Sequence, residues 1–383
     1  MLVAGARLQG CEAIYLAKEA GYYVIAVDID PDAPGGCLAD EFYEADINDR
    51  EKMSGILSRA DMVLPAVEDI RALEALVSYG REFKIPVLFD MDAYRISSSK
   101  ERSNSLFEEI GLPVPGKYPD CGFPVIIKPD NKSGSENVYK AYSEEEVQDH
   151  ILDHPGDDLI LQEFLEGPSY SLEVIGNGRD FYFPQITQVI ADDDYDCCCI
   201  AAPAEVSEDI RNQMYSIAAK LAAKLKIRGI FDIEVIDHNG TLKVLEIDAR
   251  LPSQTPISIY RSKKINMVKL MAELFCGKKP EIPKTERSLC CLYQQIYVED
   301  GCISVMGEHI MAGAGHLKII KDFYGADEVI TDYEEGASSF RAIVIISRNT
   351  FAQAQSAFER FEENLRNRIC RPALTAANCR NSA

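Results

Sequence analysis

The sequence predicts a mixed α/β protein, α+β in part, with more than one domain. At 383 residues the chain exceeds the length that one hydrophobic core usually supports. Its composition, 46% hydrophobic and 27% charged, is that of a globular protein. In the first part of the chain, short apolar runs alternate with segments of helical periodicity, which indicates βαβ units and a mostly parallel sheet.

Residues 1–97 form the first predicted domain, which is Rossmann-like in outline. Strands are expected at 2–5, 23–28, 62–66 and 87–89, with helices at 10–20 and 70–83. The first loop, from Gly5 to Gly10, lacks both the middle glycine of a dinucleotide-binding loop and the Lys-Ser/Thr of a Walker loop. A nicotinamide dinucleotide is therefore not the expected ligand, although Asp28 at the end of the second strand could accept a hydrogen bond from a ribose.

Residues 98–285 form the second predicted domain. A polar joint at 97–103 precedes a helix at 104–110, which Pro113 and Pro115 terminate. The further elements are strands at 123–129, 159–165, 171–175, 229–236 and 241–248, and helices at 143–151, with a capping box, and 207–225. A small closing domain is expected at 286–370, with strands at 288–298 and 341–346 and a helix at 349–366, and the tail 371–383 is expected to be disordered.

The net charge and the short apolar runs argue against nucleic-acid binding and against a membrane-spanning segment. A net charge of −22 argues against nucleic acid as a partner. The apolar runs are far shorter than the ~20 residues that span a bilayer, and the N-terminus does not resemble a signal peptide, so a cytoplasmic protein is expected. The twelve cysteines are then expected to be free thiols. For the run 197–199 we expect small buried side chains, with a metal role as the open alternative.

Acidic residues alternate with apolar ones on two strands near the centre of the chain. Residues two apart in a strand share a face, so Asp232 lies with Glu234 on one strand, and Glu246 with Asp248 and Arg250 on the next. Whether the two sets meet depends on the turn between the strands. A two-residue Asn-Gly turn would place them on opposite faces, whereas a three-residue loop would bring them together.

We expect the three-residue loop at 238–240, which pairs Asp237 with Thr241 and Asp232 with Glu246. The acids would then share their face with four apolar side chains, Ile230, Ile236, Leu242 and Val244. Carboxylates crowded in an apolar frame repel one another unless a cation lies among them. Oxygen ligands without His or Cys suit Mg²⁺, or Mn²⁺, rather than zinc. The other interpretation is a solvated face of alternating charge.

Basic and polar residues upstream fit the needs of a triphosphate. Lys128 lies at a strand end before the loop 131–137, and Lys100 lies in the domain joint. Lys132 and the serines that follow it could close over phosphates. The segment 162–167 reads Gln-Glu-Phe-Leu-Glu-Gly and could present backbone groups to adenine and a carboxylate to ribose.

The order of these features resembles the ATP-grasp carboxylate–amine ligases. The resemblance rests on the strand-Lys-Pro sequence, the Gly/Ser loop, Gln-Glu-x-x-Glu-Gly and the final Glu-x-Asp-x-Arg, and it runs from about 97 to 283. It implies a two-lobed ATP-grasp domain preceded by the family's usual Rossmann-like neighbour. It also implies ATP and Mg²⁺ as cofactors. Where most relatives have Asn two residues after the second Glu, this chain has Asp248.

The resemblance implies a role for each matching residue. ATP would be held by Lys100, Lys128, Ser133, Glu163, Phe164, Leu165 and either Glu166 or Glu173. The metal would be held by Glu234 and Glu246, with Asp248 either as a third ligand or as a contact to a substrate ammonium group. The substrates would be held by Gln9, Glu68, Ser103, Asp232, Arg250, Ser253 and Gln254, with Arg250 as the catalytic residue that stabilises developing negative charge.

A narrower resemblance indicates the substrates. The stretches 8–10, 86–97, 171–176, 246–255 and 265–267 are similar to family members that join 3-methyl-D-ornithine to L-lysine in pyrrolysine biosynthesis. This implies that ATP first converts the ornithine carboxylate to an acyl phosphate, and that the lysine ε-amine then displaces phosphate. The loop 131–137 would exclude water from the acyl phosphate. Two alternatives stay open, namely a ligase of another amino acid or dipeptide and a nucleotide-binding regulator without turnover.

Overall fold

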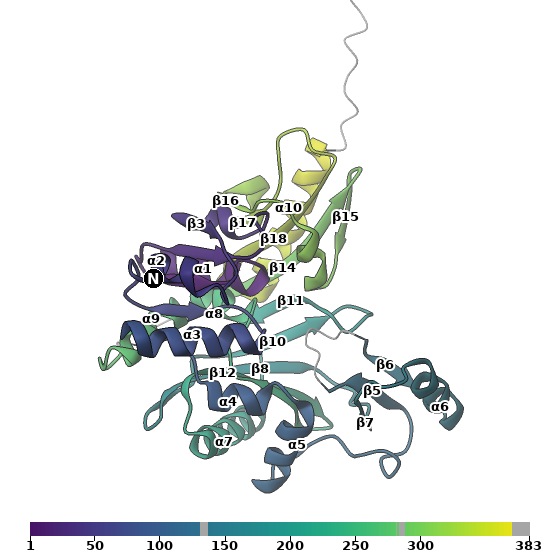
Figure 1. The fold of residues 1–383 in the computed structure, drawn as a ribbon. Coiled ribbons are helices and arrows are strands. Elements are labelled where there is room, and N and C mark those ends of the chain that lie inside the picture. Colours follow the sequence, from purple (N-terminus) through teal and green to yellow (C-terminus); the bar gives the residue numbers. More distant parts are fainter. Residues whose placement is uncertain (131–136, 281, 283–287, 370–383) are drawn as a thin grey trace, which may run out of the picture.

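The computed structural model describes residues 1–130, 137–280, 282 and 288–369, and the tail 371–383 lies outside them. The described strands form three sheets of four, eleven and three strands, with helices packed on them, which confirms the mixed α/β class. In Figure 1 the four-stranded sheet lies beside the middle of the large sheet, and the three-stranded sheet projects to one side. Among the described helices, none is both long and apolar enough to cross a membrane.

The first sheet is parallel, in the order β3-β2-β1-β4. Its strands are β1 (Leu2–Ala4), β2 (Ile25–Asp28), β3 (Glu41–Glu44) and β4 (Val63–Pro65), and its helices are α1 (Leu8–Glu19), α2 (Arg50–Leu57) and α3 (Ile70–Phe83). The expected strand 87–89 is only a bridge from Val87 to Val63. Strand β3 was not predicted, because its sequence Glu-Phe-Tyr-Glu has two adjacent aromatic residues between two acids and so shows no apolar alternation.

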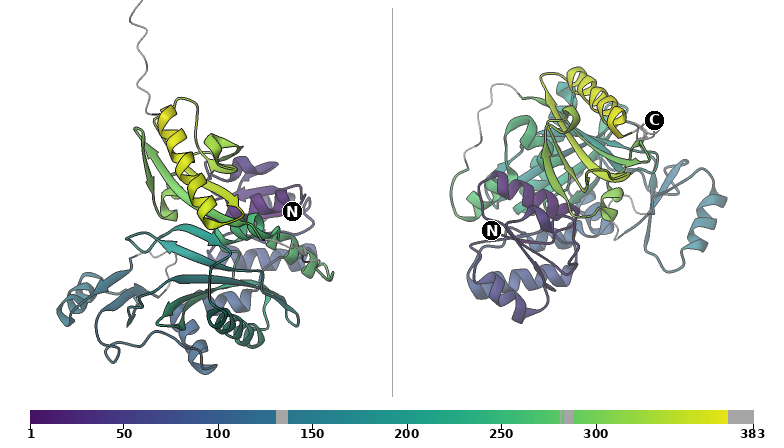
Figure 2. Two further views of the ribbon diagram at one scale, coloured as in Figure 1. Left: turned by 180° about the vertical axis from the view of Figure 1, so that it is seen from behind. Right: turned by 90° about the horizontal axis from the view of Figure 1, so that it is seen from above.

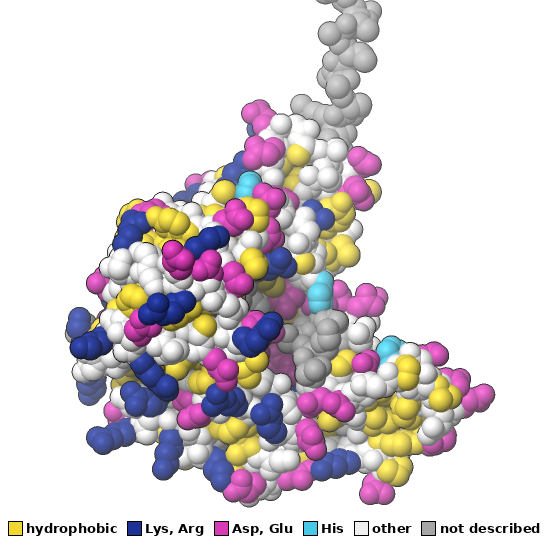
Figure 3. All heavy atoms as spheres, in the orientation of Figure 1, with side chains coloured by type: hydrophobic (Ala, Val, Ile, Leu, Met, Phe, Trp, Pro, Cys, Tyr) yellow, Lys and Arg dark blue, Asp and Glu magenta, His cyan; other side chains and the backbone are white. Residues whose placement is uncertain are grey.

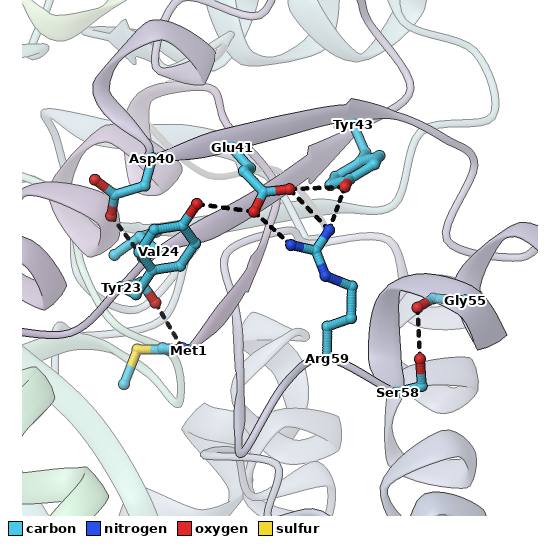
Figure 4. A network of polar contacts seen from close by, with 9 residues as sticks. All are labelled: Met1, Tyr23, Val24, Asp40, Glu41, Tyr43, Gly55, Ser58 and Arg59. Atoms are coloured by element: carbon cyan, nitrogen blue, oxygen red, sulfur yellow. Dashed lines mark hydrogen bonds and ion pairs between the residues drawn. The ribbon is translucent and has the colours of Figure 1, made fainter.

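The edge strand β3 is fixed by a surface cluster around Glu41 (Figure 4). The Glu41 carboxylate accepts hydrogen bonds from the hydroxyls of Tyr23, at 2.8 Å, and Tyr43, at 2.7 Å, and from Arg59 Nη1 at 2.8 Å. Hydrogen bonds from Arg59, Tyr43 and Tyr23 lower the pKa of Glu41 to about 2. This half-exposed edge strand is thus held by a charged cluster as well as by the packing of Phe42 and Tyr43 against the core.

The small lobe is the three-stranded sheet with one helix, α6 (Glu144–Asp153), and its core is four buried side chains, Val125, Ile127, Ala141 and Val147. Its strands are β5 (Val125–Pro129), β6 (Tyr139–Ala141) and β7 (Leu159–Glu163). The expected helix cap is present, since the Ser143 hydroxyl accepts the Glu146 N–H at 3.2 Å. Both views in Figure 2 show this lobe standing away from the rest of the chain.

The large sheet runs in the order β13-β12-β8-β10-β11-β14-β18-β17-β16. Its strands are β8 (Ser169–Asn177), β10 (Ile186–Ala191), β11 (Cys197–Ala202), β12 (Arg228–His238), β13 (Thr241–Asp248), β14 (Cys290–Glu299), β16 (Lys318–Lys321), β17 (Glu328–Thr331) and β18 (Ser339–Arg348), with β9 (Phe181–Tyr182) and β15 (Cys302–Val305) at its sides. Because β14 pairs with β11, the strands of the segment 286–370 continue the sheet of the preceding segment.

Helices pack on the large sheet both at its β8–β13 end and on its strands β14 and β18. They are α4 (Met91–Ser97), α5 (Lys100–Glu109), α7 (Glu208–Leu225), α8 (Thr255–Lys263), α9 (Met267–Phe275) and α10 (Phe351–Ile369). Helix α7 packs on β8 and β13, α10 packs on β14 and β18, and α1 of the first domain packs on α8 and α9. Helix α5 begins at Lys100 rather than at 104, because Ser99 caps it through a hydrogen bond from the Arg102 N–H at 3.2 Å.

The turn between β12 and β13 differs from the one expected. His238 pairs with Thr241, so the loop is the two residues Asn239 and Gly240. Both have positive φ, 55° and 83°, which is typical of the tight turns that join antiparallel strands. The predicted three-residue loop at 238–240 is therefore wrong.

A β-bulge nevertheless brings the acids together. Val235 pairs with Val244 but Glu234 pairs with Glu246, so Leu245 is an extra residue and the register shifts by one. Beyond the bulge, Asp232 pairs with Asp248 on the same face as Glu234 and Glu246. In the part of β13 that precedes the bulge, Leu242 and Val244 point to the other face of the sheet and belong to the hydrophobic core there. The expectation that they share the face of the acids is wrong.

Candidate active site

A cavity of about 650 Å³ lies between the small lobe and the large sheet. Figure 3 shows a hollow there, with acidic side chains in its wall. Most of the predicted site residues line it, from the first residue of α5, from the strands β5, β7, β12 and β13, and from the segments after β7 and β13. They are Lys100, Lys128, Glu163, Phe164, Leu165, Glu166, Asp232, Glu234, Glu246, Asp248, Arg250, Ser253 and Gln254.

The floor of the cavity belongs to a grid of six polar side chains on three neighbouring strands, of which all but the buried Glu173 line the cavity. One row across β8, β12 and β13 is Glu173, Asp232 and Asp248. The next row is Ser171, Glu234 and Glu246. The two rows are two residues apart on each strand, so all six side chains share one face.

Glu234 and Glu246 are two half-buried carboxylates that lie beside two lysines. Burial, and then the charge of Glu246, raise the pKa of Glu234 to about 8. Burial also opposes the ionisation of Glu246, but Lys100 and Lys128 outweigh it and lower that pKa. Lys100 Nζ lies 3.4 Å from a carboxylate oxygen of Glu246. A cation between the two carboxylates would relieve their repulsion.

These residues fit a magnesium ion that also binds phosphate. In the part of the chain that the structure describes, no three His, Cys, Asp or Glu side chains converge as a complete metal site. Mg²⁺ usually takes only one or two carboxylates and completes its shell with water and substrate phosphates. Glu234 and Glu246 supply two such carboxylates, directly opposite each other and beside two lysines.

Arg250 joins the hairpin of β12 and β13, here called the acidic hairpin, to the first domain. Its Nη2 lies 2.7 Å from Asp248 Oδ2 and 2.9 Å from Glu68 Oε1. Burial raises the pKa of Asp248 to about 6, although Arg250 opposes that rise. The buried Arg250 Nε has no hydrogen-bond partner among the described residues. Asp248 is thus engaged by Arg250, and the Nε–H of the guanidinium group is left without a partner among the described residues.

The end of β7 forms the wall opposite the grid. Glu163 accepts hydrogen bonds from the Gly116 N–H at 2.8 Å and from Lys243 Nζ at 2.6 Å, so its carboxylate fastens the small lobe to the hairpin. Phe164 and Leu165 then face the cavity, and Lys140 Nζ lies 3.4 Å from the centre of the Phe164 ring. This wall therefore offers an aromatic and an aliphatic side chain to a ligand in the cavity.

Several predicted site residues lie elsewhere. Asp28 accepts the backbone N–H groups of Ala6, at 2.8 Å, and Asp30, at 3.0 Å, and so holds the first loop. Ser103 is buried and donates to the Ile96 carbonyl at 3.3 Å. Gln9, Glu68 and Glu173 also do not line the cavity, although Glu68 contacts it through Arg250. Ser133 and most of the loop 131–137 lie outside the described residues.

Other lining residues were not predicted. Glu308 enters from the segment after β15 and accepts hydrogen bonds from Ser253 Oγ, at 2.9 Å, and Gln254 Nε2, at 2.6 Å. Cys197 Sγ lies 2.9 Å from Gln254 Oε1. Cys198 and Cys199 are buried as expected, and every cysteine among the described residues is a free thiol. Cys197 packs on the other side of the sheet from Cys198 and Cys199, because the register between β10 and β11 shifts at this point. Strict alternation would have placed Cys197 on the same face as Cys199, so no sequence pattern signals this position.

A model of the ATP-grasp domain matches residues 97–254. A 3-methyl-D-ornithine–L-lysine ligase from Methanosarcina mazei is 37% identical over 310 residues, which cover 80% of this chain and 81% of the relative. The chain belongs to the ATP-grasp ligase family. The enzyme of the same name from Methanosarcina acetivorans is 35% identical over 367 residues, 91% of this chain and 98% of the relative.

The fold is that of other ATP-grasp enzymes. The structure of a biotin carboxylase–β,γ-ATP complex from Campylobacter jejuni superposes with a TM-score of 0.73 at 15% identity, over 97% of this chain and 95% of that one. The expectation of an ATP-grasp ligase, made from the order of motifs, is thereby confirmed.

The glycine of the ATP-grasp Gln-Glu-x-x-Glu-Gly motif has a steric role. Gly167 has a φ of 150°, and a Cβ there would lie 2.0 Å from the Asp237 carbonyl oxygen. We expect Gly167→Ala to cost about 1–3 kcal/mol of folding free energy, by analogy with overpacked sites, and to raise the KM for ATP by displacing the end of β7. Urea unfolding and ATP titration measure the two effects.

Gly336→Ala is the matched control for this prediction. Gly336 also has a positive φ, 85°, but nothing lies within 4 Å of its Cβ position. It should share the conformational cost and leave the KM for ATP unchanged. Equal KM values in the two variants would contradict the steric role of Gly167.

Proposed function

We propose that this chain joins the carboxylate of 3-methyl-D-ornithine to the ε-amine of L-lysine with ATP, in pyrrolysine biosynthesis. The observation that carries the proposal is the 37% identity to a ligase of that name along four-fifths of both chains. The cavity supports it. Its described lining has eight Asp or Glu side chains against three Lys or Arg, a balance that suits substrates with two amino groups each.

The nucleotide would lie along the small lobe. Lys100 and Lys128 face the cavity and would hold the phosphates, Phe164 and Leu165 would receive adenine, and Glu166 would accept from the ribose. Glu234 and Glu246 would hold Mg²⁺, which supplies Lewis-acid stabilisation of the phosphoryl oxygens when bound.

The chemistry would proceed in two displacements. A carboxylate oxygen of the ornithine bonds to the γ-phosphorus, the bond to the β-phosphate oxygen breaks, and ADP leaves. The lysine ε-amine then bonds to the acyl carbon, phosphate leaves and the nitrogen loses its proton. Arg250, which is buried beside the carboxylates and has an unpartnered Nε, would bind the oxygen that becomes negative.

The grid supports recognition of an ammonium group. Asp232 Oδ1 and Ser171 Oγ are buried and have no hydrogen-bond partner among the described residues. An unpaired buried oxygen is costly, and an ammonium donor would satisfy both atoms. Ser253 and Gln254 would orient the substrate from the opposite side. We place the activity in the cytoplasm, where ATP and free amino acids are present.

The test is purified protein with Mg-ATP and defined pairs of amino acids. Phosphate release should require both lysine and the methylated D-ornithine, and mass spectrometry should detect their amide. Release with another amino acid pair and not with these would replace the substrate assignment by that of another amino-acid or dipeptide ligase. Nucleotide binding without release for any pair would favour a regulator.

A further inference from the structure

The segment 251–257 carries Gln254 into the cavity in a strained conformation. Gln254 has φ 75° and ψ −54°, and the Thr255 N–H donates to the Ser253 carbonyl at 2.9 Å. This is the rarer, strained kind of γ-turn. Such a conformation in a non-glycine residue persists only when its surroundings hold it.

Two side chains one turn apart on α1 hold the ends of this segment. Gln9 Nε2 donates to the Leu251 carbonyl at 2.8 Å, before the turn. Glu12 Oε1 accepts the Ile257 N–H at 2.6 Å, after the turn. Gln254, the residue that caps α8, makes no capping bond with its own side chain, so Glu12 of the first domain serves in its place.

The environment of Glu12 is unfavourable for a carboxylate. It is 2% exposed, and the described residues form no ion pair with it. Burial raises its pKa to about 8, and backbone hydrogen bonds from Ile257 and Gln254 oppose the rise. A neutral side chain would be less costly if packing were the only requirement.

The strained turn directs the Gln254 amide between two other parts of the site. The amide accepts from Cys197 on β11 at 2.9 Å and donates to Glu308 at 2.6 Å. The side chain is 3% exposed and belongs to the same cavity lining as Arg250. Its position therefore depends on the backbone of the turn, not on freedom of the side chain.

We propose that Glu12 is a positioning residue that holds the γ-turn at Gln254, so that docking of the first domain sets the geometry of the reaction cavity. Gln9 acts with it at the other end of the segment. The inference rests on the proposed ligase activity of this cavity, although not on which two amino acids are joined.

The activity test compares substitutions at Glu12 with one at Glu19. Glu12→Ala should lower kcat about ten- to a hundred-fold through misplacement of the site, with less change in the KM for ATP. Glu12→Gln should restore most of kcat, because its amide oxygen can still accept the Ile257 N–H. Glu19→Ala is the matched control, since Glu19 lies on the same helix and accepts from Tyr260 of α8 at 2.7 Å without contacting the turn. Equal kcat in Glu12→Ala and Glu19→Ala would overturn the proposal.

A stability cycle tests the same contact without any substrate. Glycine adopts positive φ without strain, so Gln254→Gly should remove the need to hold the turn. Glu12→Ala should then lower the Tm by several degrees less in the Gln254→Gly background than in the native sequence. An identical loss of Tm in both backgrounds would reject the role of Glu12. If Glu12→Ala does not fold, Glu12→Asp, which shortens the side chain by one methylene, enters the same cycle. Because this readout needs no turnover, it separates failure of this inference from failure of the proposed function.

Discussion

Glu246→Gln is expected to reduce kcat about 100-fold or more, the scale at which single electrostatic contacts act in enzyme sites. The substitution keeps the shape of the side chain and removes one charge from a group that lies opposite Glu234 and 3.4 Å from Lys100. Both the cation and the lysine would lose a partner. Phosphate release at a series of Mg²⁺ concentrations measures the effect, and half-saturation should move to higher Mg²⁺.

The control for this experiment is Glu335→Gln, an equally conservative change at an exposed position far from the cavity. It should leave kcat and the Mg²⁺ dependence unchanged. If Glu246→Gln kept the native rate and the native Mg²⁺ dependence, the assignment of Glu234 and Glu246 to the metal would be abandoned.

The acidic hairpin shows what a strand pattern can predict and what it cannot. The alternation of Asp232 with Glu234 and of Glu246 with Asp248 predicts a shared face within each strand. The pattern does not predict the register between the two strands, which depends on a bulge at Leu245. Neither neighbour of Leu245 is a glycine or a proline that would signal a bulge. The correct convergence was therefore inferred from an incorrect turn.

Contacts between distant segments were the least predictable part of the site. Glu308 reaches the cavity because β14 pairs with β11 and extends the sheet, and no local pattern around Glu308 indicates this. Asp28 shows the converse. An acid at the end of a parallel strand suits either a ribose or the neighbouring backbone, and only the structure shows that two N–H groups occupy it.

The second large effect is expected at Arg250. Arg250→Lys should lower kcat about 100- to 1,000-fold while the protein remains folded, since charge is kept but the planar group is lost. The guanidinium joins Asp248 at 2.7 Å to Glu68 at 2.9 Å and keeps a buried Nε for a ligand oxygen. A lysine ammonium can replace one of these contacts but not all three. Steady-state kinetics with a thermal melt separates the loss of rate from unfolding.

Arg95→Lys is the matched control, because Arg95 also joins α4 to a glutamate, Glu74, at 2.8 Å, but in an exposed pair. It should change neither kcat nor Tm appreciably.

A further variant, Glu68→Gln, removes only the contact from Arg250 to the first domain. If Arg250 acts mainly through its unpartnered Nε, Glu68→Gln should cost much less kcat than Arg250→Lys. If the two losses are equal, the contribution of Arg250 is the orientation that Glu68 imposes on it, and the charge stabilisation assigned to its Nε would be withdrawn.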